Sequence, residues 1–186
     1  INRPELDAKP GLINITLPTS YKLVANLPYS ITSLCLKRFL SGEVERPSLM
    51  VIMVQKEVAL RLTAKPGKMS LLSLLGQYYS QPTYIAEVPA TNFWPKPQVD
   101  SAIVSLRLIQ PALSGEDERW LWRLARIGFS SRRKMLKNNL SAGLKIKESV
   151  VVNSLTKVQQ DAQCRAQDLS IDQWLGLVGI FKDIMI

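Results

Sequence analysis

The chain has 186 residues, of which 46% are hydrophobic and 7% aromatic, so its composition excludes a disordered or collagen-like protein. It contains no histidine and only two cysteines, Cys35 and Cys164, which lack metal-ligand spacing. We therefore expect no zinc site, no disulfide framework and no histidine-dependent catalysis, and we expect both cysteines to be buried.

The net charge of +9 is concentrated in one segment of the chain. Nine Lys or Arg and no Asp or Glu lie between Arg119 and Lys147, whereas the 15 basic residues elsewhere are balanced by 15 acidic ones. Such a segment predicts a polyanionic partner, and nucleic acid is favoured over the alternative, an anionic membrane surface. The apolar run at 49–54 is too short to span a membrane, and no signal-peptide pattern is present, so we expect a soluble cytoplasmic protein.

The first part of the chain alternates predicted strands and helices. An apolar run at 21–25 predicts a strand that proline stops in the loop 26–29, and a helix capped by Ser30 or Thr32 then continues to Gly42. A second apolar run at 49–54 predicts a buried strand, followed by a helix to about residue 62. This order predicts an α/β fold with an open, mostly parallel sheet that has helices on its faces.

The remaining elements complete this sheet and add a helical region. We predict a helix at 70–79, a strand at 83–88, a proline-rich loop at 89–97 and a last strand at 102–108, which we place at the sheet edge. Helical patterns follow at 116–129, 131–140, 150–155 and 171–184. We therefore expect a sheet domain over 1–109, a linker over 110–115 and a helical domain over 116–186.

The loop Asn26-Leu27-Pro28-Tyr29 follows the first predicted strand, at the position where α/β folds bind their ligands. Its residue types suit methyl transfer to the exocyclic amine of adenine, whose nitrogen lone pair must be freed from conjugation with the ring. The side-chain oxygen of Asn26 and the carbonyl of Leu27 or Pro28 could accept hydrogen bonds from this amine, while Tyr29 stacks on the base. For an isolated tetrapeptide, however, a simple turn after a strand is the better explanation.

A second aromatic loop strengthens the catalytic interpretation. The segment 92–101, NFWPKPQVDS, lies just before the last predicted strand. On this proline-stiffened loop, Phe93 or Trp94 could close over the other face of a base that has left its stack. The alternative is that these aromatic side chains pack in the core, which we expect for one of them.

Several stretches of the chain together resemble the KsgA/RsmA family of ribosomal RNA adenine N6-dimethyltransferases, in the family's order. They are VANLPYSITS (24–33), VIMVQKEVALRL (51–62), SLLSLLGQYY (70–79), VPATNFWPKPQVDSAIVSLRL (88–108), FSSRRKMLKNNL (129–140) and CRAQDLSIDQWLGL (164–177). The resemblance implies a Rossmann-like methyltransferase domain followed by a small all-α domain. It also implies dimethylation of two adjacent adenosines near the 3′ end of 16S rRNA, with S-adenosylmethionine as donor, no metal, and the pre-30S particle as partner.

The resemblance assigns roles to individual residues of the two loops. Asn26 is expected to contact both S-adenosylmethionine and the target amine, and Tyr29 and Phe93 are expected to flank the target adenine. Leu27 and Pro28 belong to the same catalytic loop, because a carbonyl of one of them would accept the second hydrogen bond from the amine.

The chain departs from the family at its N-terminal end. Family members begin with a strand, a G-x-G-x-G loop and an acidic residue that bind the donor, and the nine glycines here have no such spacing. We therefore expect the chain to be the C-terminal part of such an enzyme, with the first strands absent, residues 1–20 as the tail of the lost half, and no activity by itself. We expect a monomer without a protein partner.

The segment Ser131-Arg132-Arg133-Lys134, with Lys137 one turn later on the predicted helix, is interpreted as a contact for the RNA backbone. A solvated basic helix face is the alternative. Two other functions stay open: an Erm-type methyltransferase acting on 23S rRNA, which shares the fold and chemistry, and a non-catalytic rRNA-binding assembly factor. Leu27 and the segment 164–170 favour the small-subunit family.

Overall fold

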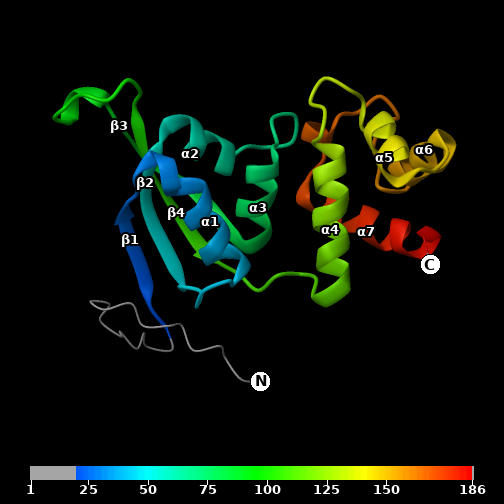
Figure 1. Ribbon diagram of the computed structural model, residues 1–186, viewed down its shortest axis with the longest axis horizontal. Helices are drawn as coiled ribbons and strands as arrows, with labels where there is room; N and C mark the ends of the chain where they lie inside the picture. Colours follow the sequence, from blue (N-terminus) through cyan, green and yellow to red (C-terminus); the bar gives the residue numbers. More distant parts are fainter. Residues whose placement is uncertain (1–19, 186) are drawn as a thin grey trace.

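The computed structural model describes residues 20–185, so the tail expected over 1–20 lies almost wholly outside the described residues. The described strands are β1 Lys22–Asn26, β2 Leu49–Gln55, β3 Ser80–Val88 and β4 Ser101–Leu108. The described α-helices are α1 Thr32–Ser41, α2 Lys56–Leu62, α3 Leu71–Tyr79, α4 Gly115–Gly128, α5 Leu136–Leu144, α6 Glu148–Lys157 and α7 Ile171–Met185 (Figure 1). Short 3-10 turns occur at Tyr29–Ile31, Ala90–Asn92 and Ala166–Asp168.

The strands form one sheet in the order β1-β2-β4-β3. β1 runs parallel to β2, whereas β4 runs antiparallel to both β2 and β3. The prediction that the last strand lies at the sheet edge is therefore wrong, because β4 is an inner strand and β3 takes the edge. The prediction of a mostly parallel sheet is confirmed for strand direction among the described strands, because β1, β2 and β3 run the same way and β4 alone is reversed, although only β1 and β2 pair in parallel.

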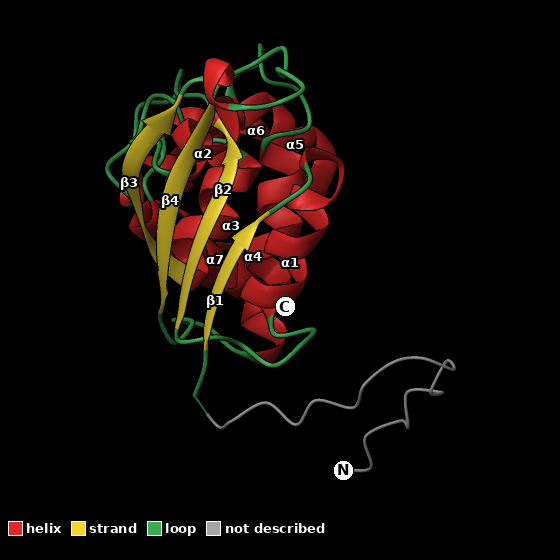
Figure 2. Cartoon of the chain, turned by 90° about the vertical axis from the view of Figure 1, so that its left-hand side faces the viewer, coloured by secondary structure: helices red, strands yellow, loops and turns green. Residues whose placement is uncertain are grey.

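The described helices all lie on one face of the sheet (Figure 2). Alternate residues of the inner strands, such as Ile52 on β2 and Val104 on β4, are fully buried beneath these helices. The residues between them, such as Val51, are only half-buried on the opposite face, which no described helix covers (Figure 2). On β1, which pairs with no other described strand at its outer edge, the side chain of Val24 is 78% exposed.

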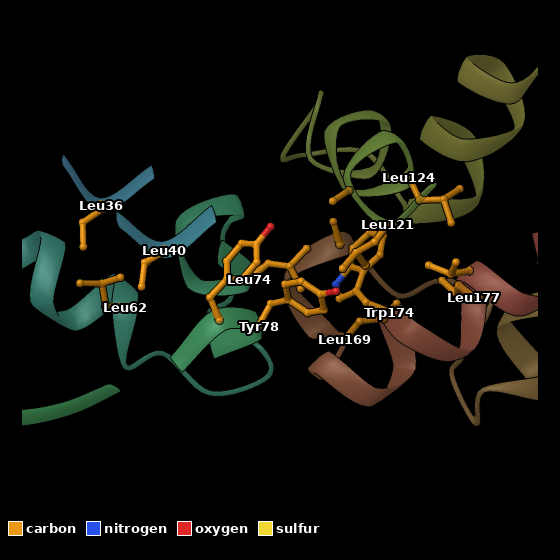
Figure 3. Close-up of a cluster of buried hydrophobic side chains, with 14 of the residues drawn as sticks. Leu36, Leu40, Leu62, Leu74, Tyr78, Leu121, Leu124, Leu169, Trp174 and Leu177 are labelled. Atoms are coloured by element: carbon orange, nitrogen blue, oxygen red, sulfur yellow. The ribbon is translucent and has the colours of Figure 1, made fainter. Parts of the chain in front are cut away.

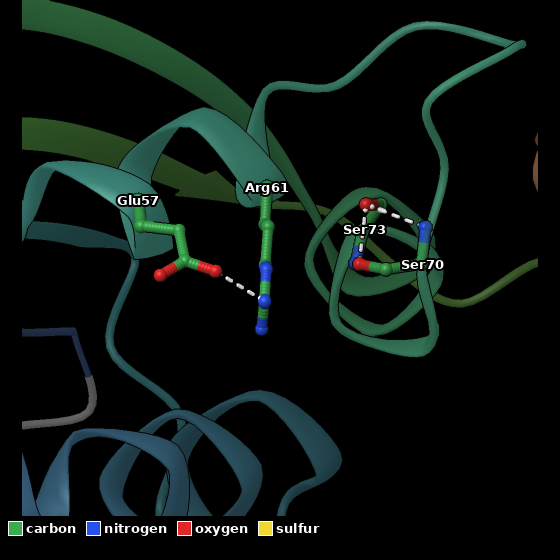
Figure 4. Close-up of polar contacts among 4 residues, drawn as sticks. All are labelled: Glu57, Arg61, Ser70 and Ser73. Carbon is green, nitrogen blue, oxygen red and sulfur yellow. Dashed lines mark hydrogen bonds and ion pairs between the residues drawn. The ribbon is translucent and has the colours of Figure 1, made fainter.

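Local sequence signals explain where several helices begin and end. Ser70 precedes α3, and its hydroxyl accepts a hydrogen bond from the backbone N–H of Ser73, whose side chain accepts one from the Ser70 N–H (Figure 4). α1 ends at Gly42, which has a φ of +79°. This left-handed conformation suits glycine and confirms the predicted end of the helix.

A continuous apolar core joins the helices that cover the sheet to the C-terminal helices (Figure 3). At the junction, Tyr79 at the end of α3 stacks on Trp122 of α4, with ring centroids 5.8 Å apart. The Tyr79 hydroxyl donates a hydrogen bond to the Glu118 carboxylate and accepts one of 3.2 Å from the Trp122 indole N–H. Burial and the bond to Glu118 raise the pKa of Tyr79 well above its usual value.

The segment between β4 and α4 is tied to this junction by hydrogen bonds. The Arg46 guanidinium donates to the backbone carbonyls of Tyr79 and Ile109, at 3.1 and 2.9 Å. The Tyr78 hydroxyl lies 3.2 Å from both the N–H and the carbonyl of Leu113. We call Arg46, Tyr78, Tyr79 and Trp122 the seam. Because the core is continuous across the seam, the division into domains at 109 and 116 stays a prediction.

Candidate active site

One cavity brings together the two loops that the sequence singled out. It has a volume of about 300 Å³ and is lined by Asn26, Leu27, Pro28, Tyr29, Phe93, Trp94, Pro95 and Pro97. The first loop follows β1 and the second connects β3 to β4, so both lie at the same end of the sheet (Figure 1). The structure thus places all five predicted catalytic residues around one space, although they come from distant parts of the chain.

Strand alternation directs the side chain of Asn26 away from the core. Ala25 packs against the buried residues, and Leu27 is only 9% exposed, with its N–H donating to the Met53 carbonyl at 3.3 Å. The intervening Asn26 is exposed on the opposite face. Its amide oxygen is therefore free to accept a hydrogen bond from a ligand.

The carbonyl of Pro28 is already used within the protein. It accepts hydrogen bonds from the N–H of Ile31 and the hydroxyl of Thr32, both at 3.1 Å. The prediction that Ser30 or Thr32 caps α1 is wrong, because the N-cap residue is Ile31 and no side chain caps the helix. Since a carbonyl oxygen has two lone pairs, the Leu27 carbonyl is the better second acceptor for an amine.

The aromatic side chains of the cavity are accessible. Tyr29 is 37% exposed, and its hydroxyl lies 2.7 Å from that of Ser101. Phe93 is half-buried, whereas Trp94 is 97% exposed. The expectation that one of the two loop aromatics packs in the core is therefore wrong, since the loop carries both away from the buried residues.

The basic segment predicted to bind RNA is a turn rather than a helix. Residues 131–135 precede α5, which begins at Leu136, so the predicted start of the helix at Ser131 is wrong. Arg132, Arg133 and Lys134 are exposed on this turn. The buried amide of Asn139 holds the turn, because its Nδ2 donates to the carbonyls of Gly128 and Ser131 at 2.7 and 3.0 Å. We call residues 131–134 the basic turn.

Lys137 differs from its three basic neighbours. It lies on α5, and its ammonium forms an ion pair of 2.7 Å with Glu148 at the start of α6. Its side chain is 21% exposed, so part of its charge is already neutralised within the protein. The structure thus groups Arg132, Arg133 and Lys134 together and sets Lys137 apart.

A groove extends from the basic turn between α1, α2, α3 and α4. It consists of three adjoining hollows of about 650, 260 and 300 Å³, which share lining residues such as Arg126 and Arg132. We call it the basic groove, since its charged lining residues are all cationic: Lys37, Arg61, Lys68, Arg119, Arg126 and Arg132. Arg61 pairs with Glu57 on α2 beside the start of α3 (Figure 4).

Sequence reasoning missed most residues of the basic groove. They come from separate elements, and no spacing along the chain links a lysine of α1 to an arginine of α4. Only the lack of acidic residues between Arg119 and Lys147 pointed to part of it. The largest of the three hollows is also lined by apolar side chains, including Leu72, Leu75 and Trp122.

The cysteines are packing residues rather than nucleophiles. Cys164 is buried, as predicted, and burial raises the pKa of its thiol to about 11. Cys35 on α1 is half-buried against the core. Among residues 20–185, no cluster of three or more His, Cys, Asp or Glu side chains could hold a metal ion. None of the described helices is long and apolar enough to cross a membrane.

Comparison with known proteins gives a consistent result. The sequence profile of a family described as "Ribosomal RNA adenine dimethylase" matches residues 7–183. Two curated relatives from Dehalococcoides mccartyi, both called "Ribosomal RNA small subunit methyltransferase A", are 43% identical over 164 residues and 45% identical over 155 residues. These matches cover 88% and 83% of this chain but 56% and 53% of the relatives, so the chain spans little more than half of their length.

Two solved structures share the fold. A dimethyladenosine transferase from Plasmodium falciparum has a TM-score of 0.72 and 27% identity, over 94% of this chain and 71% of that one. The 23S rRNA methyltransferase ErmE has the same TM-score at 23% identity, over 90% of this chain and 67% of its own. The described elements are thus the corresponding part of a Rossmann-like methyltransferase, as predicted, with β4 running against the other three described strands.

Proposed function

Because the chain belongs to the ribosomal RNA adenine dimethylase family, we propose that it supplies the base-binding part of a small-subunit rRNA dimethyltransferase. The proposed reaction is N6,N6-dimethylation of two adjacent adenosines near the 3′ end of 16S rRNA, during maturation of the pre-30S particle. The observation that carries this proposal is the cavity in which Asn26 and Leu27 meet Tyr29 and Phe93.

The cavity suits an adenine that has left its stack. The amide oxygen of Asn26 and the carbonyl of Leu27 would accept the two hydrogens of the exocyclic amine, which directs the nitrogen lone pair out of the ring plane. Tyr29 and Phe93 would bind the two faces of the base, and stacking on an aromatic side chain contributes about 1–3 kcal/mol per base. The reaction therefore needs no imidazole, which agrees with the absence of histidine.

S-adenosylmethionine is the proposed donor, and when bound it would supply the methyl group as an electrophile. Asn26 is the residue that we propose to contact it. The position of Asn26 fits this role, because its exposed side chain stands at the end of β1 on the uncovered side of the sheet. The residues of this chain then serve to bind the adenine and to hold its amine in place. No metal ion has a role in this scheme.

RNA backbone contacts are proposed for Arg132, Arg133, Lys134 and Lys137. Support comes from the exposure of the basic turn and from its continuity with the basic groove through Arg132. Phosphate contacts of this kind orient a substrate without selecting its sequence. Because Lys137 is paired with Glu148, we expect it to contribute least of the four to RNA backbone binding. We further propose that the protein acts as a monomer in the cytoplasm.

Two alternatives are less well supported. An Erm-type enzyme for 23S rRNA shares the fold, but ErmE is 23% identical, whereas the curated small-subunit relatives from Dehalococcoides mccartyi reach 43% and 45%. A non-catalytic rRNA-binding factor would have no need for Asn26, Tyr29 and Phe93 around one cavity.

The proposal is tested by joining this chain to the preceding half of the relative from Dehalococcoides mccartyi, which is 45% identical over the matched region. The joined protein is incubated with labelled S-adenosylmethionine and with small-subunit or large-subunit particles that lack the modification. We expect label on adjacent adenosines of the small-subunit RNA only. Label on the large subunit would favour the Erm-type function, and a folded joined protein without transfer to either particle would favour the binding factor. The preceding half alone is the control.

A further inference from the structure

The start of β4 lies between the two loops that form the base cavity. Ser101, the first residue of β4, pairs with Gln55 at the end of β2 and with Val88 at the end of β3. Asp100 comes directly before it, and the backbone carbonyl of Asp100 accepts a hydrogen bond of 3.0 Å from the N–H of Lys56. This pair of residues is therefore fixed by neighbouring strands on both sides.

Ser101 contacts the first aromatic wall of the cavity. Its side chain is buried, with 1% exposure, and its hydroxyl shares a hydrogen bond of 2.7 Å with the hydroxyl of Tyr29. Tyr29 stands on a short 3-10 turn, and its ring is partly open to solvent. The bond to Ser101 therefore fixes the hydroxyl end of a ring that stays partly exposed and lines the cavity.

Asp100 contacts the loop that carries the second aromatic wall. Its carboxylate accepts a hydrogen bond of 2.9 Å from the N–H of Ala90, which begins the 3-10 turn leading to Phe93. Hydrogen bonds to a charged acceptor are stronger than those between neutral groups. Next to this point, Lys56 and Glu87 form an ion pair of 2.6 Å. The start of the loop is thus anchored, whereas Trp94 farther along it is almost fully exposed.

We propose that Asp100 and Ser101 are positioning residues that set the distance between the two aromatic walls. Because the two residues are consecutive at the start of β4, they fix the position of Tyr29 relative to the loop that carries Phe93. The gap between the walls is then ready for a flat base before the base enters. This inference rests on the proposed function, since it assigns the walls to base binding.

The first test follows the two rings in the 186-residue chain without RNA. Fluorinated tyrosine and phenylalanine are incorporated, and the signals of Tyr29 and Phe93 are assigned by substitution and followed by ¹⁹F NMR. We expect Ser101→Ala to shift and sharpen the Tyr29 signal, and Asp100→Ala to do the same for Phe93. Ser101→Thr and Asp100→Asn, which keep an oxygen in place, should preserve both signals. Ser105→Ala on the same strand is the control.

The second test measures base capture with an RNA hairpin that carries 2-aminopurine at the proposed target position. In the parent chain, stacking should quench the fluorescence, and Ser101→Ala and Asp100→Ala should each weaken capture by about fivefold to tenfold. Total RNA affinity, measured by filter binding, should not change. Thermal unfolding identifies any alanine variant that has lost its fold. For such a position, base capture is instead compared between the parent chain and Ser101→Thr or Asp100→Asn.

The outcomes separate the two proposals. Unchanged ring signals in both alanine variants, or ring changes without weaker capture while the parent chain still quenches 2-aminopurine, would overturn the positioning role and leave the proposed function intact. Altered ring signals in a parent chain that never quenches 2-aminopurine would instead support the positioning role and count against the proposed base-binding function.

Discussion

The ammonium of Lys137 on α5 and the carboxylate of Glu148 on α6 lie 2.7 Å apart. This ion pair distinguishes Lys137 from Arg132, Arg133 and Lys134, which the basic turn exposes. The sequence predicted all four within two turns of one helix, whereas the structure exposes the first three on a turn and pairs Lys137 with Glu148. The distinction provides a matched control for the proposed RNA contacts.

Replacing Arg132, Arg133 and Lys134 by Gln should weaken RNA binding and its dependence on salt. Each neutralised phosphate contributes about 0.9 to the slope of log affinity against log salt concentration, so the slope should flatten by about two to three units. Affinity is measured by filter binding at several salt concentrations. Lys137→Gln should change the slope little, and a triple variant with the parental slope would return the turn to a solvated basic surface.

Asn26→Ala should remove an acceptor that acts mainly in the transition state. In the joined protein, turnover should therefore fall by about 10²–10³-fold, while RNA binding stays close to normal. Methyl transfer to small-subunit particles is the assay. Asn153→Ala, at an exposed position on α6, is the matched control. Near-normal turnover of the Asn26 variant would leave the proposed polarisation of the amine without support.

Tyr29→Ala and Phe93→Ala should weaken capture of the extruded base rather than the chemical step. Each change should cost about 1–3 kcal/mol of base binding, visible as reduced quenching of 2-aminopurine in a bound hairpin. Trp94→Ala should have a smaller effect, because this side chain is 97% exposed. Equal losses of base capture in Trp94→Ala and Phe93→Ala would show that the outer part of the loop also binds the adenine, and not only the anchored part next to Ala90.

The 186-residue chain should bind S-adenosylmethionine weakly or not at all. Its glycines have no G-x-G-x-G spacing, and Asn26 is the single donor contact that we propose on it. Isothermal titration calorimetry on the chain and on the joined protein tests this expectation. Micromolar binding by the chain itself would show that the donor site lies elsewhere than the resemblance implies.

The strand and helix patterns of the sequence located most elements but not their neighbours. Alternation in 102–108 correctly predicted a strand, and β4 spans Ser101–Leu108. The same alternation occurs in inner and edge strands, so it could not reveal that β4 inserts between β2 and β3. That position depends on pairing between segments far apart in the chain.

The sequence predicted those residues of the candidate site that have a recognisable chemical use within a short motif. Asn26 and Tyr29 were identified because their residue types and loop position suit one reaction, whereas the choice of Phe93 over Trp94 came from the family resemblance. The structure places all three around one cavity. Ser101 and Asp100 were not identified, although both are in the quoted motif, because a serine or aspartate before a strand has many structural uses. Their roles follow only from the 2.7 Å and 2.9 Å contacts.

Tyr79→Phe should destabilise the protein by about 1–3 kcal/mol, because Glu118 and the indole N–H of Trp122 lose their buried partner. The raised pKa of Tyr79 also makes a pH prediction. Its stabilisation is present below the ordinary tyrosine pKa of about 10 and is lost as pH rises from there through the folded value. Urea unfolding from pH 8 upward should therefore show a shallower alkaline loss in Tyr79→Phe.

The control for this series is Tyr84→Phe, since the Tyr84 hydroxyl forms no hydrogen bond with the described residues. Its free energy of unfolding should match that of the parent chain at neutral pH. If Tyr79→Phe were equally stable, the contacts of Tyr79 with Glu118 and Trp122 would contribute nothing to the junction.

The seam has a consequence for the spacing between the two parts of the protein that are proposed to contact RNA. Arg46, Tyr78 and Tyr79 fix the segment that leads from the sheet to α4, and α4 leads directly to the basic turn. The basic turn and the base cavity are therefore held at a fixed distance from each other. An RNA that engages both would have to present its target adenosine at a set distance from the phosphates that the turn is proposed to bind. Lengthening or shortening the RNA between these points would then move the methylated position, without any change in the residues that contact the base.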